Sequence, residues 1–292
     1  DVTAQMKSLQ DALNRRGESA DVVRDGAGKI KVHYRVSRNP LVSIIIPTKD
    51  RWDMLRQCIK SVESVTRYPS YEIVVVDNGS RTAKAKEYLS TLSKKWIIHR
   101  FPGPFNFSEI NNYGASKANG EFLLFLNDDT QVIAPEWMSA MVAQAQRTGV
   151  GAVGAKLLYP SGMIQHAGVV LGIRGVAGHA FRHLRGDTQH YRGLPHMLRN
   201  CSAVTAACML VSRDVFRQVN GFDERLAVEF NDVDLCLRIQ QQGYRIVYTP
   251  EAELYHHENA TRRGRRAPDD EARFRLKWGE FIMKGDPYYN PN

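Results

Sequence analysis

The sequence predicts an α/β fold in which helices cover both faces of a mostly parallel sheet. Strand-like and helical segments alternate between residues 41 and 130. The strand-like segment at residues 122–126 is entirely apolar and that at 41–46 is apolar except for Ser43, which is typical of strands buried on both faces. Three of the predicted strands end in polar residues, as expected where the strand ends of such a sheet meet a ligand.

The elements follow one another in a regular order through this part of the chain. After the strand at 41–46, a helix is predicted at 52–65, because Leu55, Ile59 and Val62 fall on one face. The remaining elements expected here are a strand at 71–76, a helix at 83–92, a strand at 96–99, a helix at 108–118 capped by Ser108, and the strand at 122–126.

The pattern is less regular on either side of this region. Residues 1–40 form a polar appended segment or linker, with a helix expected at 5–14 and an edge strand at 29–36. After residue 150 we expect strands at 149–156, 204–211, 244–248 and 253–257, helices at 231–242 and 269–283, and an extended loop or hairpin region at 160–200. This mixture predicts a mixed C-terminal part.

The composition limits the classes of protein to which the chain can belong. The chain has 292 residues, of which 43% are apolar, enough for one large or two small domains. No apolar run approaches the roughly 18–20 residues that span a bilayer. The four cysteines form no C-x-x-C pair, so neither disulfides nor a zinc site is expected and a reducing cytoplasm fits. The chain begins at Asp1 without a signal peptide pattern, which favours a module of a longer protein or a processed one.

The net charge of +9 favours a polyanionic partner: nucleic acid, anionic lipid or a phosphate-bearing small molecule. The sharpest basic run is residues 262–266, and no nucleic-acid-binding motif or interleaved aromatic residue accompanies it. Nucleic acid is therefore not expected as the main partner. The same run is expected either to close over a bound ligand as a lid or to be a solvated loop.

Polar clusters follow the first, second and fourth predicted strands. They are Thr48-Lys49-Asp50, Asp77-Asn78 and Asp128-Asp129. Two adjacent carboxylates repel each other unless a cation or hydrogen-bond donors compensate their charge, and a divalent metal that holds a phosphate would do so. A solvated Asx turn is the alternative. No G-x-G-x-x-G follows the first strand and no P-loop occurs, which excludes a dinucleotide-fingerprint fold and a P-loop enzyme.

Five blocks of sequence, taken in order, carry a resemblance to a known family. They are residues 42–48 (VSIIIPT), 72–80 (EIVVVDNGS), 120–129 (GEFLLFLNDD), 221–224 (GFDE) and 231–238 (NDVDLCLR). Together they resemble the inverting nucleotide-sugar glycosyltransferases of family 2, which have the GT-A fold. With His256-His257-Glu258, the set is similar to the branch that builds bacterial surface polysaccharides, including O-antigen and rhamnose-rich chains.

The resemblance covers residues 41–262 and divides them into a nucleotide-sugar half at 41–130 and an acceptor half at 131–262. A basic loop and a C-terminal helix follow at 263–292. Within the first half, the resemblance implies that Asp77 accepts a hydrogen bond from the nucleotide base, with an Asx turn as the alternative. It also implies that Pro47, Thr48 and Asp50 line the same pocket, with capping of the next helix as the alternative for Asp50.

The resemblance also implies a metal site for Mn²⁺ or Mg²⁺ that bridges the donor diphosphate. Asp129 is assigned to the metal and Asp128 to the ribose or the metal shell, while Asn127 stands where the family usually has Asp. His256 matches a late metal ligand and His257 is the alternate, since adjacent residues of a strand face opposite sides. The resemblance places Asn112 and Arg262 near the diphosphate.

The general base that the resemblance implies is Asp232, at the start of a helix. Asn231 stands where the family has Glu, so Asn231 is expected only to hydrogen-bond the acceptor, on whose side Asp234 is also placed. A helix N-terminus lowers the pKa of a carboxyl, so burial or the nearby Asp234 has to raise it for Asp232 to act as a base. A helix cap is the alternative role of Asp232.

The implied activity is that of a metal-dependent inverting glycosyltransferase, of the hexosyl or rhamnosyl type. It would use a UDP- or dTDP-sugar donor and a glycan or lipid-linked glycan acceptor, in the bacterial cytoplasm and peripherally at the inner face of an anionic membrane. A non-catalytic nucleotide- or glycan-binding module is the main alternative. A nucleotidyltransferase would carry a Gly- and Arg-rich loop that residues 47–50 do not supply, and a polyanion-binding protein would show salt-dependent binding without a metal.

Overall fold

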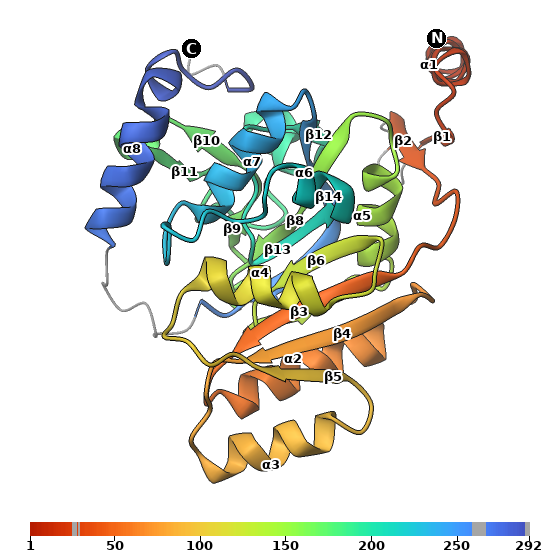
Figure 1. Ribbon diagram of the computed structural model, residues 1–292. Coiled ribbons are helices and arrows are strands. Elements are labelled where there is room, and N and C mark those ends of the chain that lie inside the picture. The colour runs from red at the N-terminus through yellow and green to blue at the C-terminus, as the bar shows by residue number, and fades with distance from the viewer. Residues whose placement is uncertain (25–27, 29, 259–266, 290–292) are drawn as a thin grey trace.

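One ten-stranded sheet forms the centre of the protein (Figure 1). The structure is a computed structural model and describes residues 1–24, 28, 30–258 and 267–289. The strand order is β12-β14-β8-β13-β6-β3-β4-β5, with β7 paired to β14 and β9 paired to β8. The sheet thus joins the two halves of the chain through the β13–β6 pair.

The first half of the sheet is parallel, as predicted. Strand β3 (Val42–Thr48) lies between β4 (Tyr71–Asp77) and β6 (Phe122–Leu126), and β4 pairs in turn with β5 (Ile97–Arg100). Thr48 and Asp77 are direct partners at the end of the β3–β4 ladder. The polar residues that follow these strands therefore meet at one edge of the sheet.

The second half of the sheet is mixed, which the sequence also predicted. Strand β13 (Cys208–Ser212) runs antiparallel between β6 and β8 (Val150–Leu158), and β14 (Arg245–His256) runs parallel to β8. The strands expected at 244–248 and 253–257 are one strand, β14, whose register shifts between Thr249 and Glu253. Its end pairs antiparallel with β7 (Thr130–Val132), with His256 opposite Thr130, so the end of β14 lies next to the acidic motif.

Helices cover both faces of the sheet. Two cores result, because alternate residues of β3 point to opposite sides: Ile45 joins one core, whereas Ile44 and Ile46 join the other. The first core includes residues of α4 (Phe107–Lys117), α6 (Arg213–Gln218), α7 (Asn231–Gln241) and α8 (Pro268–Met283), and the second those of α2 (Trp52–Val65), α3 (Ala83–Leu92) and α5 (Trp137–Ala145). The predicted α/β class is confirmed.

Helix α4 begins one residue earlier than expected and has a different cap. The side chain of Asn106 accepts hydrogen bonds from the backbone N–H groups of Ser108 and Glu109, so the predicted cap at Ser108 is wrong. Asn106 has the extended backbone and the short amide that suit an N-cap. The Ser108 hydroxyl instead donates to the carbonyl of Leu226 and ties α4 to the loop that precedes α7.

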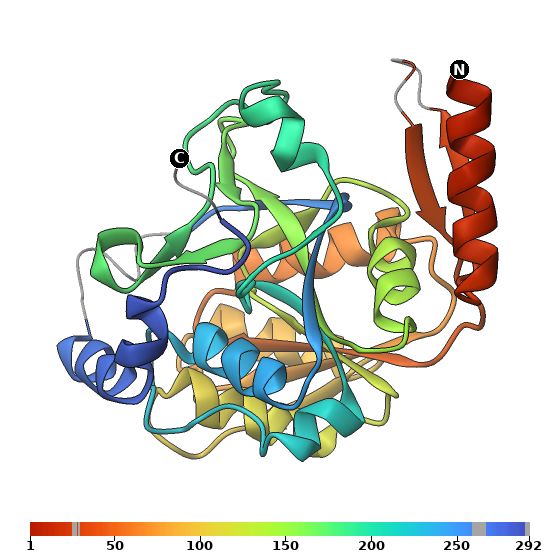
Figure 2. The same cartoon turned by 90° about the horizontal axis from the view of Figure 1, so that it is seen from above.

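The N-terminal segment forms a small unit beside the main sheet (Figure 2). Helix α1 (Val2–Arg15) packs on a hairpin of β1 (Ala20–Arg24) and β2 (Ile30–Tyr34), which pair only with each other within the described part of the chain. Arg147, just after α5, forms an ion pair with Glu18 at 3.1 Å and stacks on the ring of Tyr34. These contacts hold the unit against the second half of the main domain.

Residues 160–200, expected as a loop or hairpin region, contain a hairpin and short helical turns. Strand β10 (Val169–Leu171) pairs with β11 (Ala177–His179) around η1 (Ile173–Gly175), and β9 (Ile164–His166) adds to β8. The segment continues through η2 (Tyr191–His196) to β12 (Arg199–Asn200). In the part of the chain that is described, no helix has the length and apolarity needed to cross a membrane.

Candidate functional site

The carboxyl ends of β3, β4 and β6 form the floor of the candidate site. The Thr48 hydroxyl donates to the Asp128 carboxylate at 2.7 Å, which joins the ends of β3 and β6 directly. Asp77, at the end of β4, accepts a hydrogen bond from the backbone N–H of Ser80 at 2.8 Å. That bond spans three residues, one more than the predicted Asx turn, and the proposed contact of Asp77 with a nucleotide base stays a prediction. Pro47 lies partly buried beside it in β3.

Asp50 connects two loops at this edge and does not cap α2. Its carboxylate accepts hydrogen bonds from the backbone N–H groups of Arg81 and Thr82, at 2.7 and 2.8 Å. These bonds hold the pKa of Asp50 below its usual value, the bond from Thr82 contributing most. The N-cap position of α2 is Arg51, which makes no side-chain cap bond. Asp50 therefore fixes the loop after β4 against the loop after β3.

The paired carboxylates lie in a partly enclosed, charged environment. Asp129 is 7% exposed, and its two oxygens lie 3.1 Å from His256 Nε2 and 3.6 Å from Arg51 Nη1. Burial raises the pKa of Asp128 to about 6, and the charge of Asp129 adds to this, against the hydrogen bond from Thr48. The hydrogen bond from Thr48 and the charges of Arg51 and His256 thus offset only part of the cost of burying the charged form of Asp128.

His256 presents one defined nitrogen to Asp129. Its Nδ1 lies 2.5 Å from Gln165 Oε1, and Gln165 Nε2 in turn donates to Glu258 at 3.1 Å. An amide oxygen can only accept, so His256 donates a proton from Nδ1 to Gln165. Asn127 Nδ2 lies 3.2 Å from Nε2 of the same ring.

This pair of groups fits a divalent cation held together with a phosphate. Asp129 Oδ1 and His256 Nε2 lie 3.1 Å apart, so a carboxylate oxygen and an imidazole nitrogen are close enough to bind one cation together. Among the described residues, no cluster of three or more His, Cys, Asp or Glu side chains could hold a metal by itself. Mg²⁺ and ions like it commonly bind one or two protein ligands and complete their shell with substrate phosphates and water. The His256 ring lies beside the Asp129 carboxylate, whereas the backbone N–H of His257 donates to the Asp129 carbonyl at 2.9 Å.

The predicted base, Asp232, lies in the first turn of α7 and is partly exposed. Its carboxylate accepts hydrogen bonds from the backbone N–H groups of Ala206 and Val233, at 3.1 and 2.8 Å. The N-cap of α7 is Phe230, which has a left-handed backbone and makes no side-chain cap bond. Asn231 is buried, and the contact of its amide with the carbonyl of Leu226 is long, at 3.5 Å.

Asp234 does not face a binding site. It is 0% exposed, and its carboxylate accepts hydrogen bonds from Arg238 Nε at 2.7 Å and Trp278 Nε1 at 2.9 Å, with Lys277 Nζ at 2.7 Å. These partners lie on α7 and α8, so the structure gives Asp234 a role in holding the two helices together rather than the predicted contact with an acceptor.

Asn112 is likewise engaged within the fold. Its amide nitrogen donates to the carbonyl of Phe222 and to Glu224, both at 3.0 Å, and its oxygen accepts from the Phe222 N–H at 2.9 Å. Both amide protons are used, so the expected contact with a diphosphate would have to break this turn. Arg262, the other residue expected at the diphosphate, and the basic run at 262–266 lie outside the described residues.

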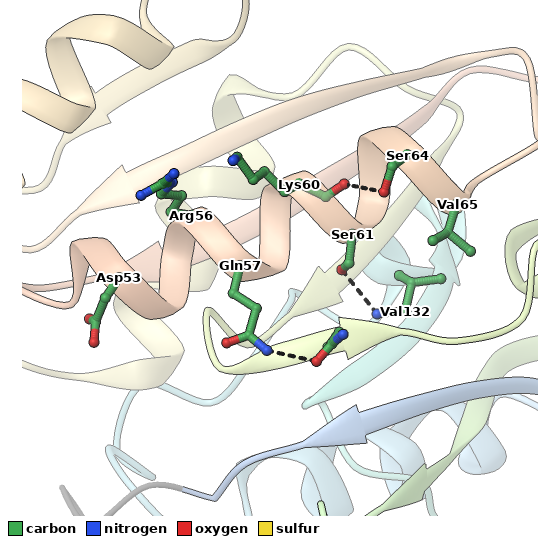
Figure 3. Close-up of a pocket in the computed structure, with 9 residues that line it drawn as sticks. Asp53, Arg56, Gln57, Lys60, Ser61, Ser64, Val65 and Val132 are labelled. Carbon is green, nitrogen blue, oxygen red and sulfur yellow. Dashed lines mark hydrogen bonds between the residues drawn. The ribbon is translucent and has the colours of Figure 1, made fainter.

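A shallow pocket of about 450 Å³ lies elsewhere, on the outer side of α2 against β7 (Figure 3). Its lining includes Arg56, Gln57 and Lys60, and Gln57 is hydrogen-bonded to Gln131 at 2.7 Å. None of the predicted site residues lines this pocket. The residue at the acidic edge that sequence reasoning missed is Arg51, whose only signal was its position between Asp50 and the start of a helix.

Sequence comparison then decides the family. A family model described as glycosyl transferase family 2 matches residues 43–219. The chain belongs to glycosyl transferase family 2. It is 43% identical over 299 residues to the O-antigen biosynthesis protein RfbC of Myxococcus xanthus, and 44% identical over 302 residues to the protein y4gI of Sinorhizobium fredii. These alignments cover 99% and 98% of this chain, but only 23% and 33% of the relatives.

Two solved structures share the fold of this family 2 domain. The mannosyltransferase PcManGT of Pyrobaculum calidifontis, solved with GDP-Man and Mn²⁺, superposes with a TM-score of 0.60 at 14% identity and covers 78% of this chain and 60% of its own. GalNAc-T7, solved with UDP, GalNAc and Mn²⁺, superposes with a TM-score of 0.66 at 17% identity and covers 84% of this chain and 50% of its own. The predicted GT-A fold is confirmed.

Proposed function

We propose that this family 2 domain is an inverting, metal-dependent glycosyltransferase. It moves a sugar from a nucleoside diphosphate donor to a glycan or lipid-linked glycan acceptor in the synthesis of a bacterial surface polysaccharide. The similarity to an O-antigen biosynthesis protein supports the setting. The proposal concerns this domain, since the chain spans a third or less of those two relatives.

The observation that supports the proposal most is the connection between the acidic motif and the base. The backbone N–H of Asn127 donates to the carbonyl of Ala207 at 3.1 Å, and the N–H of the neighbouring Ala206 donates to Asp232 at 3.1 Å. One short segment thus contacts both the acidic motif and the proposed base. Two substrates bound on either side of it would be held close enough to react as a unimolecular pair.

In the proposed reaction, Asp232 takes the proton of an acceptor hydroxyl. The oxygen forms a bond to the anomeric carbon of the donor sugar, on the face opposite the diphosphate. The bond from that carbon to the phosphate oxygen breaks, and its electron pair leaves with the nucleoside diphosphate. The sugar is inverted in one displacement, and no covalent intermediate with the protein forms.

The donor side relies on Asp129 and His256 to hold a divalent cation, Mn²⁺ or Mg²⁺. When bound, such a cation would stabilise the negative charge of the departing diphosphate as a Lewis acid. Arg51, which lies 3.6 Å from Asp129, adds a positive charge at the same place. We favour a uridine or deoxythymidine diphosphate sugar, from the family resemblance, and Asp77 and Thr48 for its nucleoside.

Titration calorimetry of UDP, dTDP and GDP tests the donor pocket, first with Mn²⁺ and then with EDTA. We expect one nucleotide to bind with Mn²⁺, and EDTA or Asp129→Ala to abolish this binding. Asp11→Ala is the matched control, because it removes an exposed carboxylate of α1. Failure of the folded protein to bind any of the three nucleotides would refute the proposal.

A non-catalytic nucleotide- or glycan-binding module is the second candidate. The observation that favours it is that Asn127 and Asn231 stand where the family has acids. Turnover of the donor distinguishes the two functions. The enzyme should release nucleoside diphosphate, and Asp232→Asn should abolish release while nucleotide binding persists. A binding module would show equal, negligible release by the wild type and the variant.

A further inference from the structure

Two histidines that the proposed reaction does not use form a pair beside the base. His166, at the end of β9, is fully buried, and His179, at the end of β11, is partly exposed. Their Nδ1 atoms lie 2.8 Å apart, and their rings are nearly perpendicular, at 86°. A distance of 2.8 Å requires one proton between the two nitrogens.

The surroundings determine which nitrogen carries that proton. The backbone N–H of Gly168 donates to His166 Nε2 at 3.3 Å, so this nitrogen holds a lone pair and the proton of His166 is on Nδ1. His166 then donates to His179 Nδ1, which leaves the proton of His179 on Nε2. Burial lowers the pKa of both residues, most strongly that of His166, so both rings are neutral.

Strand pairing connects His179 to the segment that binds Asp232. Val169 of β10 pairs with His179 on one side and forms a bridge with Ala203 on the other. Three residues further on, Ala206 donates its N–H to Asp232. The charge of Asp232 acts on His179 and opposes the effect of burial on the His179 pKa.

The two side chains do not bind each other directly in the described part of the chain. Within the described part of the chain, no hydrogen bond or ion pair joins His179 to Asp232, and His179 Nε2 has no hydrogen-bond partner. This nitrogen is also not among the sealed, unpartnered atoms of the core. The remaining charges that act on His179 include Arg182 and Glu258, which neutralise each other in an ion pair at 3.1 Å.

We propose that His179 donates its Nε2 proton in a hydrogen bond to the attacking hydroxyl of the acceptor, and that His166 is the positioning residue that fixes this tautomer. The hydroxyl lies between the two side chains and donates its proton to Asp232. One oxygen lone pair accepts from His179, which directs the other lone pair to the anomeric carbon. This inference rests on the proposed function and adds a residue that orients the acceptor.

Histidine-selective ¹⁵N NMR of the intact chain tests the tautomers without any substrate. We expect His166 to carry its proton on Nδ1 and His179 on Nε2, with the signals assigned from their loss in His166→Asn and His179→Gln. A proton on Nδ1 of His179, or an imidazolium at pH 7.5, would overturn the proposal. This result does not depend on whether the protein transfers sugar, so it separates failure of this inference from failure of the proposed function.

Kinetics with n-octyl glycoside acceptors tests the contact itself. We expect His179→Ala to raise the acceptor KM about tenfold, the value of one lost hydrogen bond, with unchanged nucleotide affinity by calorimetry. His179→Gln should largely restore KM, because its amide N–H can take the position of the imidazole Nε2–H. His190→Ala, which removes an exposed histidine of the same region, is the matched control. An acceptor KM unchanged in His179→Ala would refute the contact.

Discussion

Replacement of Asp234 by Ala tests the assignment of this acid to the fold rather than to the substrate. The carboxylate is fully buried, and it accepts from Arg238, Trp278 and Lys277. Its loss leaves two cations and an indole N–H without their common partner. Breaking a buried ion pair by removing one partner costs about 3–5 kcal/mol.

For Asp234→Ala we expect a loss at the lower end of that range of about 3–5 kcal/mol. Lys277 is 34% exposed and lies 3.5 Å from Asp223, and Arg238, 16% exposed, also donates to the carbonyl of Val219. Both cations thus keep water or a second partner. We expect Asp234→Ala to lower the free energy of unfolding by about 3 kcal/mol, or Tm by about 5 °C for a chain of this length.

Asp234→Ala and Asp232→Ala form a matched pair of variants for urea unfolding and calorimetry. Both variants remove one carboxylate from the first turn of α7, but Asp232 is partly exposed and accepts only two backbone N–H groups. Asp232→Ala should lose about 1 kcal/mol or less and abolish sugar transfer. A stability loss below 1 kcal/mol in Asp234→Ala, together with a raised acceptor KM, would refute the reasoning and return Asp234 to the acceptor site.

Three further variants or conditions follow from the same contacts. Asp128→Asn should raise stability at pH 7.5 by about 1–3 kcal/mol, because a pKa raised to about 6 means that the fold disfavours the charged carboxyl; thermal unfolding without metal measures this. Gly154→Ala should cost about 1–3 kcal/mol in urea unfolding, since a Cβ would lie 2.4 Å from that of Val204. The contribution of His166 and His179 to stability should fall as the pH drops below 6.5, because the folded state keeps them neutral while the unfolded chain takes up protons, so the urea midpoint of the wild type should fall more than that of His166→Asn. Asp128 contributes with the opposite sign in both chains, and an equal or smaller fall in the wild type would contradict the prediction.

The parallel half of the fold could be predicted because its signals are local. Strands buried on both faces appear as almost continuous apolar runs, α2 has the bounds that its apolar spacing predicted, and α3 also has the predicted bounds. Helix α5 was missed because most of its nine residues are buried and it has no polar face to set a period. Strands β7, β9, β10 and β11 have three residues each, too few to show a pattern in the sequence, and the partner of β7 is the distant β14.

The family resemblance predicted which residues of the acidic edge lie together, but not the contacts of the other site residues. Asp129 and His256, 127 positions apart in the chain, lie together as expected, at 3.1 Å. The role of Asp234 could not be foreseen, because Lys277 and Trp278 are more than 40 residues away and no pattern in the sequence links them to it. Arg51 was missed for a related reason, since a single arginine before a helix becomes informative only when its neighbour Asp129 is known.

The C-terminal helix determines how the proposed base is held. Asp270, in the first turn of α8, accepts hydrogen bonds from the backbone N–H groups of Val228 and Glu229, at 2.7 and 2.9 Å. The ring of Phe274 stacks on Phe230, whose left-handed backbone begins α7.

These contacts fix the turn that leads into Asp232. They cross the boundary that we predicted between residues 262 and 263, and they lie beyond residue 219, where the match to the family model ends. Since α8 also holds Asp234 two residues after the base, the position of Asp232 depends on a helix that carries none of the proposed catalytic residues.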